Sequence, residues 1–518
     1  MLINFLALLP FFLIIYFLVI RGVKSYKVMI GVYGVTLFLL VTIWNMELLS
    51  VVFATIRGIL VSFEVFLIII SVLLLFNLLQ QRGKLDTIKT FLKEYSSNPH
   101  VQIIIIGWFI VSFFEGIAGF GTPAAIAAPL LVFLGFRAIT AIVITLVADS
   151  VSVVFGAFGT PIIIGILGSV PQTVSLEQVT FITAILNGVI AIIMPLVLLV
   201  LYHILEKIPL KKLRPSILFA LLSGVFFAIP FILTALFIGP ELPSVIGAIV
   251  GLILSIIMIN HGYAVPSANS TSIHIVDILK SVSPYFVLIG LLLITRLDLF
   301  NVSYLINLLS IEISFISSQV EPFVLTPSTP GFLIFLTFIF FSILYLNTHS
   351  LTKDEILSIC TTSFDKVKFV FITLLFTLSF VQLLLYSNIN TSVYDGIPQI
   401  IGAMFSNLGL LYILFAPLIG AFGSFIAGSA TVSNLIFSPL QYEASLINKI
   451  PEGLTLALQA SGAAAGNMIA IHNILAVSAL VSVFDKEAQI IKINGIIVVC
   501  YCVLLSTLGF FIYFTGMI

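Results

Sequence analysis

Apolar runs long enough to cross a membrane follow one another along almost the whole chain. Residues 2–20, 28–44, 217–238 and 491–514 are examples, and the first is expected to be a retained span rather than a signal peptide. Because a membrane-spanning helix needs about 20 predominantly apolar residues, the pattern predicts an all-α polytopic membrane protein with about 12–14 spans. No stretch is polar enough to form a soluble domain, so residues 1–518 are expected to form one integral membrane domain.

Two of these apolar runs are interrupted at corresponding positions. Residues 115–123 read EGIAGFGTP, and residues 424–431, 309 positions later, read SFIAGSAT. A second Gly-rich break follows at the same interval of 38 residues in each half, at FGTP (158–161) and at Gly466. Irregular backbone at membrane depth is tolerated only where it is buried in protein or lines a cavity. Paired interruptions in two halves therefore indicate a transporter's binding site, built from re-entrant hairpins and broken helices.

The positive charges suggest that the two halves are inverted relative to each other. The basic loops at 82–93 and 207–214 are expected to be cytoplasmic, which places the N-terminus outside. The span before residues 82–93 runs toward a basic loop, whereas its counterpart at 369–386 is preceded by lysines and runs away from them. We predict an inverted-repeat secondary transporter with one repeat at about 50–260 and the other at about 355–518.

The connecting part, at about 261–354, is expected to hold further spans and an external loop with short helices at 301–330. Residues 85–95 mix apolar and charged positions, which predicts a short amphipathic helix on the inner membrane surface.

Composition supports the membrane assignment and excludes several other classes. The chain is 61% hydrophobic and 8% charged, whereas soluble domains are roughly 25% charged. The formal net charge is zero, so nothing points to a nucleic-acid partner. The three cysteines give neither a disulfide framework nor a metal-type spacing, and neither a metal nor a cofactor is expected. The chain also lacks GxxxxGK[ST], HExxH and GxSxG motifs, which argues against ATP-driven transport and against an intramembrane enzyme.

Few charged residues occur within the first broken region, and two of them are candidates for coupling to protons. Ionisable groups at membrane depth are costly and by default suggest function. Glu115 lies one helical turn before the first break and is the first choice; Asp149 precedes the second break and is the second choice. His472 is the third choice, with a hydrogen bond to substrate or backbone as its alternative role. The alternatives are that Glu115 caps the hairpin helix and that Asp149 lies near an interface. Glu64 has equal claims to a transport role and to a structural partner such as Arg57.

The second half carries hydroxyls and amides instead of charges around its breaks. Half-helix N-termini have free N–H groups and a positive dipole end, which suit a small carboxylate. The alternative is that the small residues only allow tight helix packing. The residues predicted to bind substrate, in both halves, are Gly119, Gly121, Thr122, Gly159, Thr160, Gly428, Ser429, Thr431, Ser433, Asn434, Gln459, Asn467, His472 and Asn473.

The same segments resemble the L-lactate permease family, and the resemblance covers essentially the whole chain. It rests on long motifs at residues 115–129 (EGIAGFGTPAAIAAP), 155–161 (FGAFGTP), 420–434 (GAFGSFIAGSATVSN) and 459–473 (QASGAAAGNMIAIHN). The resemblance implies a carrier in the cell membrane that moves lactate and related 2-hydroxy monocarboxylates, such as glycolate, together with protons. This chain has Ala430 where the family pattern has Asn, so the substrate class is better supported than lactate itself.

Other functions remain compatible with the sequence. A carrier of another small organic anion, such as a dicarboxylate or a sulfonate, would share the fold, and competition by lactate for uptake would distinguish it. Sodium could replace the proton as the coupling ion. A channel needs a continuous polar path, which the paired breaks argue against.

Overall fold

The computed structural model describes residues 2–17, 21, 23–83, 98–119, 122–261, 283–284, 286–288, 290–291, 294–295, 304, 306, 308–315, 319–327, 329–481, 483 and 486–516. The predicted amphipathic helix at 85–95 lies outside these residues.

The helices of the first half are α1 (Leu2–Ile15), α2 (Ser25–Thr42), α3 (Leu48–Gln81), α5 (Pro99–Gln102), η2 (Ile103–Ile110), α6 (Val111–Ile117), α7 (Thr122–Phe133), α8 (Ala138–Ser152), η3 (Val153–Phe155), α9 (Gly156–Thr160), η4 (Pro161–Ile166), η5 (Leu167–Ser169), α10 (Leu176–Leu205), η6 (Leu210–Ser216), α11 (Ile217–Phe237) and α12 (Pro243–Asn260). The remaining elements are β1 (Ile311–Ile313), β2 (Phe323–Leu325), α15 (Pro330–Asn347), α16 (Lys353–Leu385), α17 (Ile397–Ala403), η8 (Ser406–Leu411), α18 (Tyr412–Ala427), α19 (Ala430–Asn448), α20 (Glu452–Gly466), η9 (Asn467–Ile469), α21 (Ile471–Leu480) and α22 (Glu487–Thr515).

The all-α membrane fold is confirmed. Within the described residues, ten helices are long and apolar enough to cross a membrane, and three shorter apolar helices accompany them. Residues 301–330 were predicted to form an external loop with short helices; in the described part of this range, β1 and β2 form a small antiparallel sheet that was not predicted. Alternating β-branched residues and phenylalanine favour strands over helix in this short segment.

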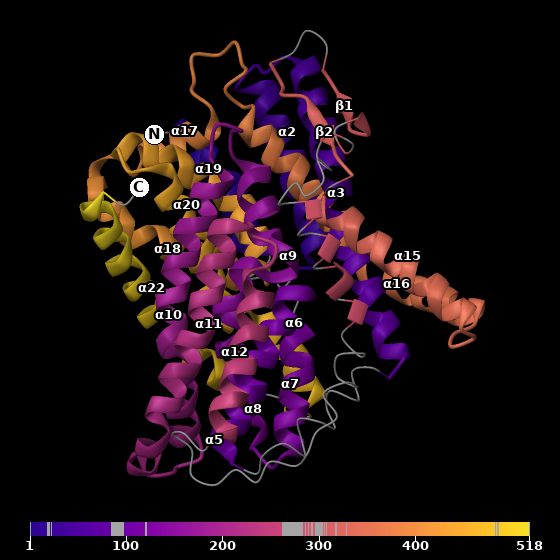
Figure 1. Ribbon diagram of the computed structural model, residues 1–518. Coiled ribbons are helices and arrows are strands. Elements are labelled where there is room, and N and C mark those ends of the chain that lie inside the picture. Colours follow the sequence, from indigo (N-terminus) through magenta and orange to yellow (C-terminus); the bar gives the residue numbers. More distant parts are fainter. Residues whose placement is uncertain are drawn as a thin grey trace.

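The helices form a main bundle and a protruding arm. In the arm, α16 packs along α3 and α2, and α15 packs on α3 (Figure 1). Close approach of α3 and α16 depends on Gly58, because a Cβ there would collide with the backbone of Ser379. The main bundle contains α5 to α12 and α17 to α22, and α18 packs against α20 through Gly420 and Gly462. The alternative interpretation of small residues as packing positions is therefore correct for these two glycines.

Each predicted hairpin is formed by a long apolar segment and the helix that follows it. The first consists of α5, η2 and α6, after which α7 turns back and packs against α6 and η2. The second consists of α18 and α19, which pack against each other on either side of Gly428.

The two hairpins have their outer ends toward different ends of the bundle (Figure 1). At one end, the Arg137 guanidinium after α7 donates to the Leu205 carbonyl of α10 at 2.9 Å. Toward the other end, near α17, the indole N–H of Trp44 donates to the Asp395 carbonyl at 2.9 Å. The inverted relation of the halves stays a prediction, with which this arrangement is compatible.

Candidate functional site

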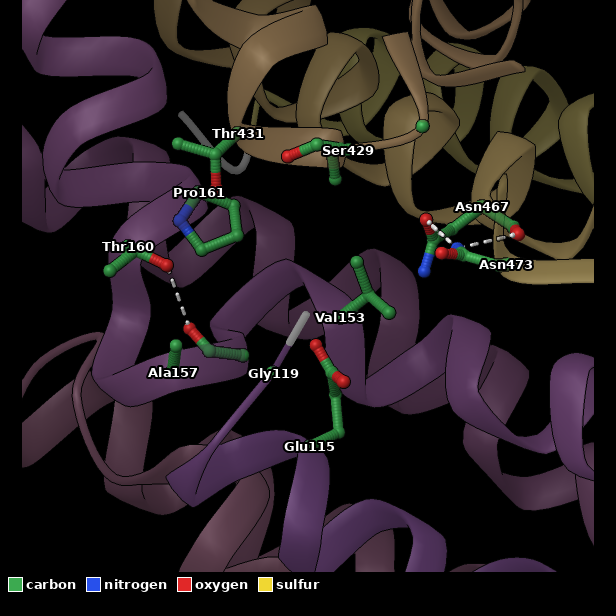
Figure 2. Close-up of a pocket in the computed structure, with 13 residues that line it drawn as sticks. Glu115, Gly119, Val153, Ala157, Thr160, Pro161, Ser429, Thr431, Asn467 and Asn473 are labelled. Atoms are coloured by element: carbon green, nitrogen blue, oxygen red, sulfur yellow. Dashed lines mark hydrogen bonds between the residues drawn. The ribbon is translucent and has the colours of Figure 1, made fainter. Parts of the chain in front are cut away.

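All four breaks of the chain meet at one pocket, which lies where the two halves face each other (Figure 2). The space between its walls, including the part open to solvent, is about 380 Å³. The residues that line it are Glu115, Gly119, Val153, Gly156, Ala157, Thr160, Pro161, Gly428, Ser429, Ala430, Thr431, Asn467 and Asn473. The sequence motifs therefore lie at one place although they are up to 358 positions apart (473 − 115 = 358).

The wall from the first half is irregular backbone between helices. Gly119, with φ of 58°, ends the turn after α6. Between η3 and η4, Ala157, Phe158 and Gly159 have φ of 44°, 55° and 80°. Positive φ is costly for residues with a Cβ, at about 1–3 kcal/mol each, and such strain concentrates at ligand sites and switch regions. Thr160 then begins a regular turn, and its hydroxyl donates to the Gly156 carbonyl at 3.2 Å.

The wall from the second half contains the start of α19 and the break between α20 and α21. Gly428 has φ of 70° and ends α18, and the Ser429 hydroxyl caps α19 by accepting the N–H of Val432 at 3.4 Å. Thr431 follows in the first turn of the helix, where N–H groups have no partner within the helix. In the other break, the Asn473 amide donates to the Asn467 side-chain oxygen at 2.8 Å (Figure 2).

Two carboxyl groups lie at this site. Glu115 is 4% exposed and its side chain points into the pocket (Figure 2). Asp149 of α8 is 3% exposed and is not one of the lining residues. The two carboxyls are within hydrogen-bonding reach of each other. The Asn467 amide donates to Asp149 Oδ2 at 3.5 Å. Glu115 Oε2 accepts no N–H or O–H from the described residues, which argues against the alternative that Glu115 is a helix cap.

Three predicted substrate-binding residues lie behind the pocket instead of in it. The Ser433 hydroxyl donates to the Gly420 carbonyl at 2.8 Å, and the Asn434 amide donates to the Pro161 carbonyl at 3.0 Å. The Gln459 amide donates to Ser433 and to Asn434, each at 3.3 Å. These side chains hold α19 against α18, α20 and η4, so they support the wall.

The other predicted residues divide into three groups. Gly119, Thr160, Gly428, Ser429, Thr431, Asn467 and Asn473 line the pocket, as does Glu115. Gly159 lies in the break, where its Cβ position would meet the backbone of Pro240. Gly121, the Thr122 side chain and the His472 side chain lie outside the described residues.

Several lining positions were not predicted from the sequence, namely Val153, Gly156, Ala157 and Pro161, whereas Ala430 was singled out only as a departure from the family pattern. They are apolar or contribute backbone, and residue type gives no signal for that role.

Arg57 has a structural partner, but it is not Glu64. Its guanidinium forms an ion pair with Glu321 at 3.4 Å and donates to the Gln382 side chain. Gln382 donates in turn to the Gly168 carbonyl at 3.0 Å, which ties the arm to the segment after the second break. Within the described part of the chain, no three His, Cys, Asp or Glu side chains form a metal site.

Comparison with known proteins gives a consistent result. The sequence model of the L-lactate permease family matches residues 4–515. A putative L-lactate permease of Haemophilus influenzae is 29% identical over 96% of this chain and 96% of its own length. The L-lactate permease of Bacillus subtilis is 24% identical over 94% of this chain and 91% of its own. A glycolate permease of Escherichia coli is 24% identical over 82% of this chain and 80% of its own.

Proposed function

The chain belongs to the L-lactate permease family, and we propose that it is a secondary active carrier of lactate and related 2-hydroxy monocarboxylates such as glycolate. We propose further that it lies in the cell membrane with its N-terminus outside and that transport is driven by protons. The observation that carries the proposal is the convergence of all four breaks on a single pocket between the two halves.

The chemistry of the pocket suits a small hydroxy acid. The wall offers hydroxyls from Ser429 and Thr431, amides from Asn467 and Asn473, and N–H groups at the start of α19. Helix N-termini favour anions because of their free donors and dipole, worth about 0.3–1 kcal/mol for an exposed charge and up to about 2 when partly buried. None of the described residues that line the pocket is Lys, Arg or His. The substrate carboxylate would therefore be bound by neutral donors, and its hydroxyl would have acceptors and donors nearby.

Proton coupling is assigned to Glu115. A carboxyl buried without a cationic partner favours its neutral form, so a proton bound there offsets the arrival of a substrate anion. Glu115 lines the pocket directly, and a bound anion would interact with it across a short, poorly solvated distance. The two hairpins would expose the pocket alternately to the two sides of the membrane, as expected for inverted repeats.

The test is uptake of labelled L-lactate into proteoliposomes under a pH gradient without sodium, and under a sodium gradient without a pH difference. We expect accumulation only when the outside is acidic, with competition by glycolate and little by succinate or a sulfonate. Glu115→Gln should still exchange labelled for unlabelled lactate but should not accumulate it. Glu443→Gln is the matched control, because Glu443 does not line the pocket. Its carboxyl accepts a hydrogen bond from the Gln399 amide at 2.8 Å. Accumulation of lactate driven by the sodium gradient would refute the proposal. Uptake of a dicarboxylate that lactate fails to inhibit would also refute it.

A further inference from the structure

The buried carboxyls of Glu115 and Asp149 lie next to each other, and a role for Glu115 alone does not explain this pairing. Glu115 Oε2 and Asp149 Oδ1 are both buried, and neither accepts a hydrogen bond from an N–H or O–H of the described residues. The carboxyl groups themselves are close enough to hydrogen-bond. Two ionised carboxylates cannot satisfy each other, because both are acceptors only; one proton between them satisfies both.

In the part of the chain that the structure describes, the two carboxyls are each other's only charged neighbours. Among the described residues, no Lys, Arg or His acts on either group, although helices and breaks pack against α6 and α8 from several sides. Two like charges within hydrogen-bonding reach of each other disfavour double ionisation, so the pair is expected to hold a proton.

The remaining contacts make the two carboxyls unequal. Asp149 Oδ2 accepts the Asn467 amide at 3.5 Å, and a donor of this kind stabilises an ionised carboxylate. Glu115 Oε1 instead lies against Gly156, in the space that a Cβ would fill, and Gly156 directs its own N–H to the Val153 carbonyl. Asn467 is held in this orientation by Asn473, whose amide donates to its side-chain oxygen at 2.8 Å.

We propose that Glu115 and Asp149 form one dyad that holds a single proton between Glu115 Oε2 and Asp149 Oδ1, and that Asn467 is the positioning residue that keeps Asp149 as the ionised member. The proton resides on Glu115, whose hydroxyl donates to Asp149. Because Asn473 both lines the pocket and holds Asn467, a substrate that engages Asn473 also acts on the dyad. Substrate and proton are thereby linked through three side chains. The role of this link in transport rests on the proposed function, whereas the dyad itself does not.

Infrared spectroscopy of the purified protein in lipid tests the dyad without any substrate. The carbonyl stretching band of a protonated carboxyl has a different frequency from the bands of a carboxylate. Difference spectra between the wild-type protein and each variant isolate the band of the Glu115–Asp149 pair. Near neutral pH we expect Glu115→Gln to remove one protonated carboxyl. Asp149→Asn should keep the band area but shift its frequency, because the Glu115 hydroxyl loses its anionic acceptor.

The Asn467 variants test the positioning role. Without the amide, the dyad binds a second proton more readily, so Asn467→Leu should increase the pair's band about twofold near neutral pH. Asn467→Ser is the second variant, because its shorter side chain cannot reach Asp149 and perturbs packing less. The matched control is Asn448→Leu, since the Asn448 amide donates only within its own helix, to Ala444 at 2.9 Å.

A band unchanged by Glu115→Gln, or a wild-type band already corresponding to two protonated carboxyls in the pair, would overturn the dyad. Wild-type band area in both folded Asn467 variants would overturn the positioning role. Absence of lactate transport would leave these spectra as they are and would refute only the proposed function.

Discussion

Replacing Gly156 by alanine should displace the carboxyl of Glu115 while leaving the local backbone intact. Gly156 has φ of −66° and ψ of 155°, which alanine adopts without strain. The added Cβ would overlap Glu115 Oε1, and the three heavy atoms nearest to it all belong to Glu115. The substitution therefore acts on one side chain, and that side chain is 4% exposed and cannot move out into solvent.

The size of the effect follows from these contacts. Forcing an extra methyl group into a packed site costs about 1–3 kcal/mol. If the carboxyl turns away from Asp149, a hydrogen bond to a charged group is also lost, at about 1.5–3 kcal/mol. The loss of the hydrogen bond alone should reduce the rate of proton-driven lactate accumulation by roughly ten- to 150-fold. Exchange of lactate without net proton movement should fall much less.

Shortening the glutamate provides the decisive comparison. Glu115→Asp removes one methylene and makes room for the new Cβ, so the double variant with Gly156→Ala should recover part of the lost accumulation. The two single effects should be non-additive by about 0.5–3 kcal/mol. Gly34→Ala is the control, because nothing lies within 4 Å of a Cβ there. Wild-type pH dependence in Gly156→Ala, or strict additivity with Glu115→Asp, would refute the assigned contact.

Three further predictions concern the pocket and the topology. Thr431→Val should weaken lactate binding by about 1.5–3 kcal/mol, measured as Kd at constant pH. Asn434→Leu should instead lower Tm, because it leaves the buried Pro161 carbonyl without its donor. Ala430→Asn adds an amide to the wall and should increase the preference for lactate over succinate in competition assays; an unchanged preference would show that this position does not contact substrate. Cysteines at Lys211 and Val393, both exposed, should react with an impermeant reagent from opposite sides of the membrane, and labelling from one side would contradict the inverted repeat.

The position of the site could be predicted from the sequence because its backbone has a compositional signature. Glycine, threonine and proline interrupt apolar segments at four places, and only a few arrangements bury such breaks without exposing them to lipid. Gly119, Gly428 and Asn467, which were predicted at these breaks, line the pocket. The sequence could not show how the four breaks lie relative to one another, since contacts between the halves depend on helix packing.

The roles of individual polar side chains on α19 could not be predicted in the same way. Thr431 lines the pocket, whereas Ser433 and Asn434 face the interior of the bundle, although all three lie within four residues of sequence. Neighbouring residues on a helix point in different directions, and the sequence alone does not state which face meets the cavity. The contact between Asn467 and Asp149 was missed for a related reason, since it joins residues 318 positions apart.

Among the described residues that line the pocket there is no Lys, Arg or His, and this has a consequence for energetics across the membrane. Moving one uncompensated elementary charge through the membrane potential is worth about 2.3 kcal/mol per 100 mV. A substrate anion that travels with one proton adds no net charge, so the loaded and empty carriers respond equally to voltage. Net flux is then governed by the lactate and pH differences alone. Under the proposed proton coupling, the direction of flux would reverse whenever the outward lactate gradient exceeds the inward proton gradient, so the same protein would release its substrate as readily as it takes it up.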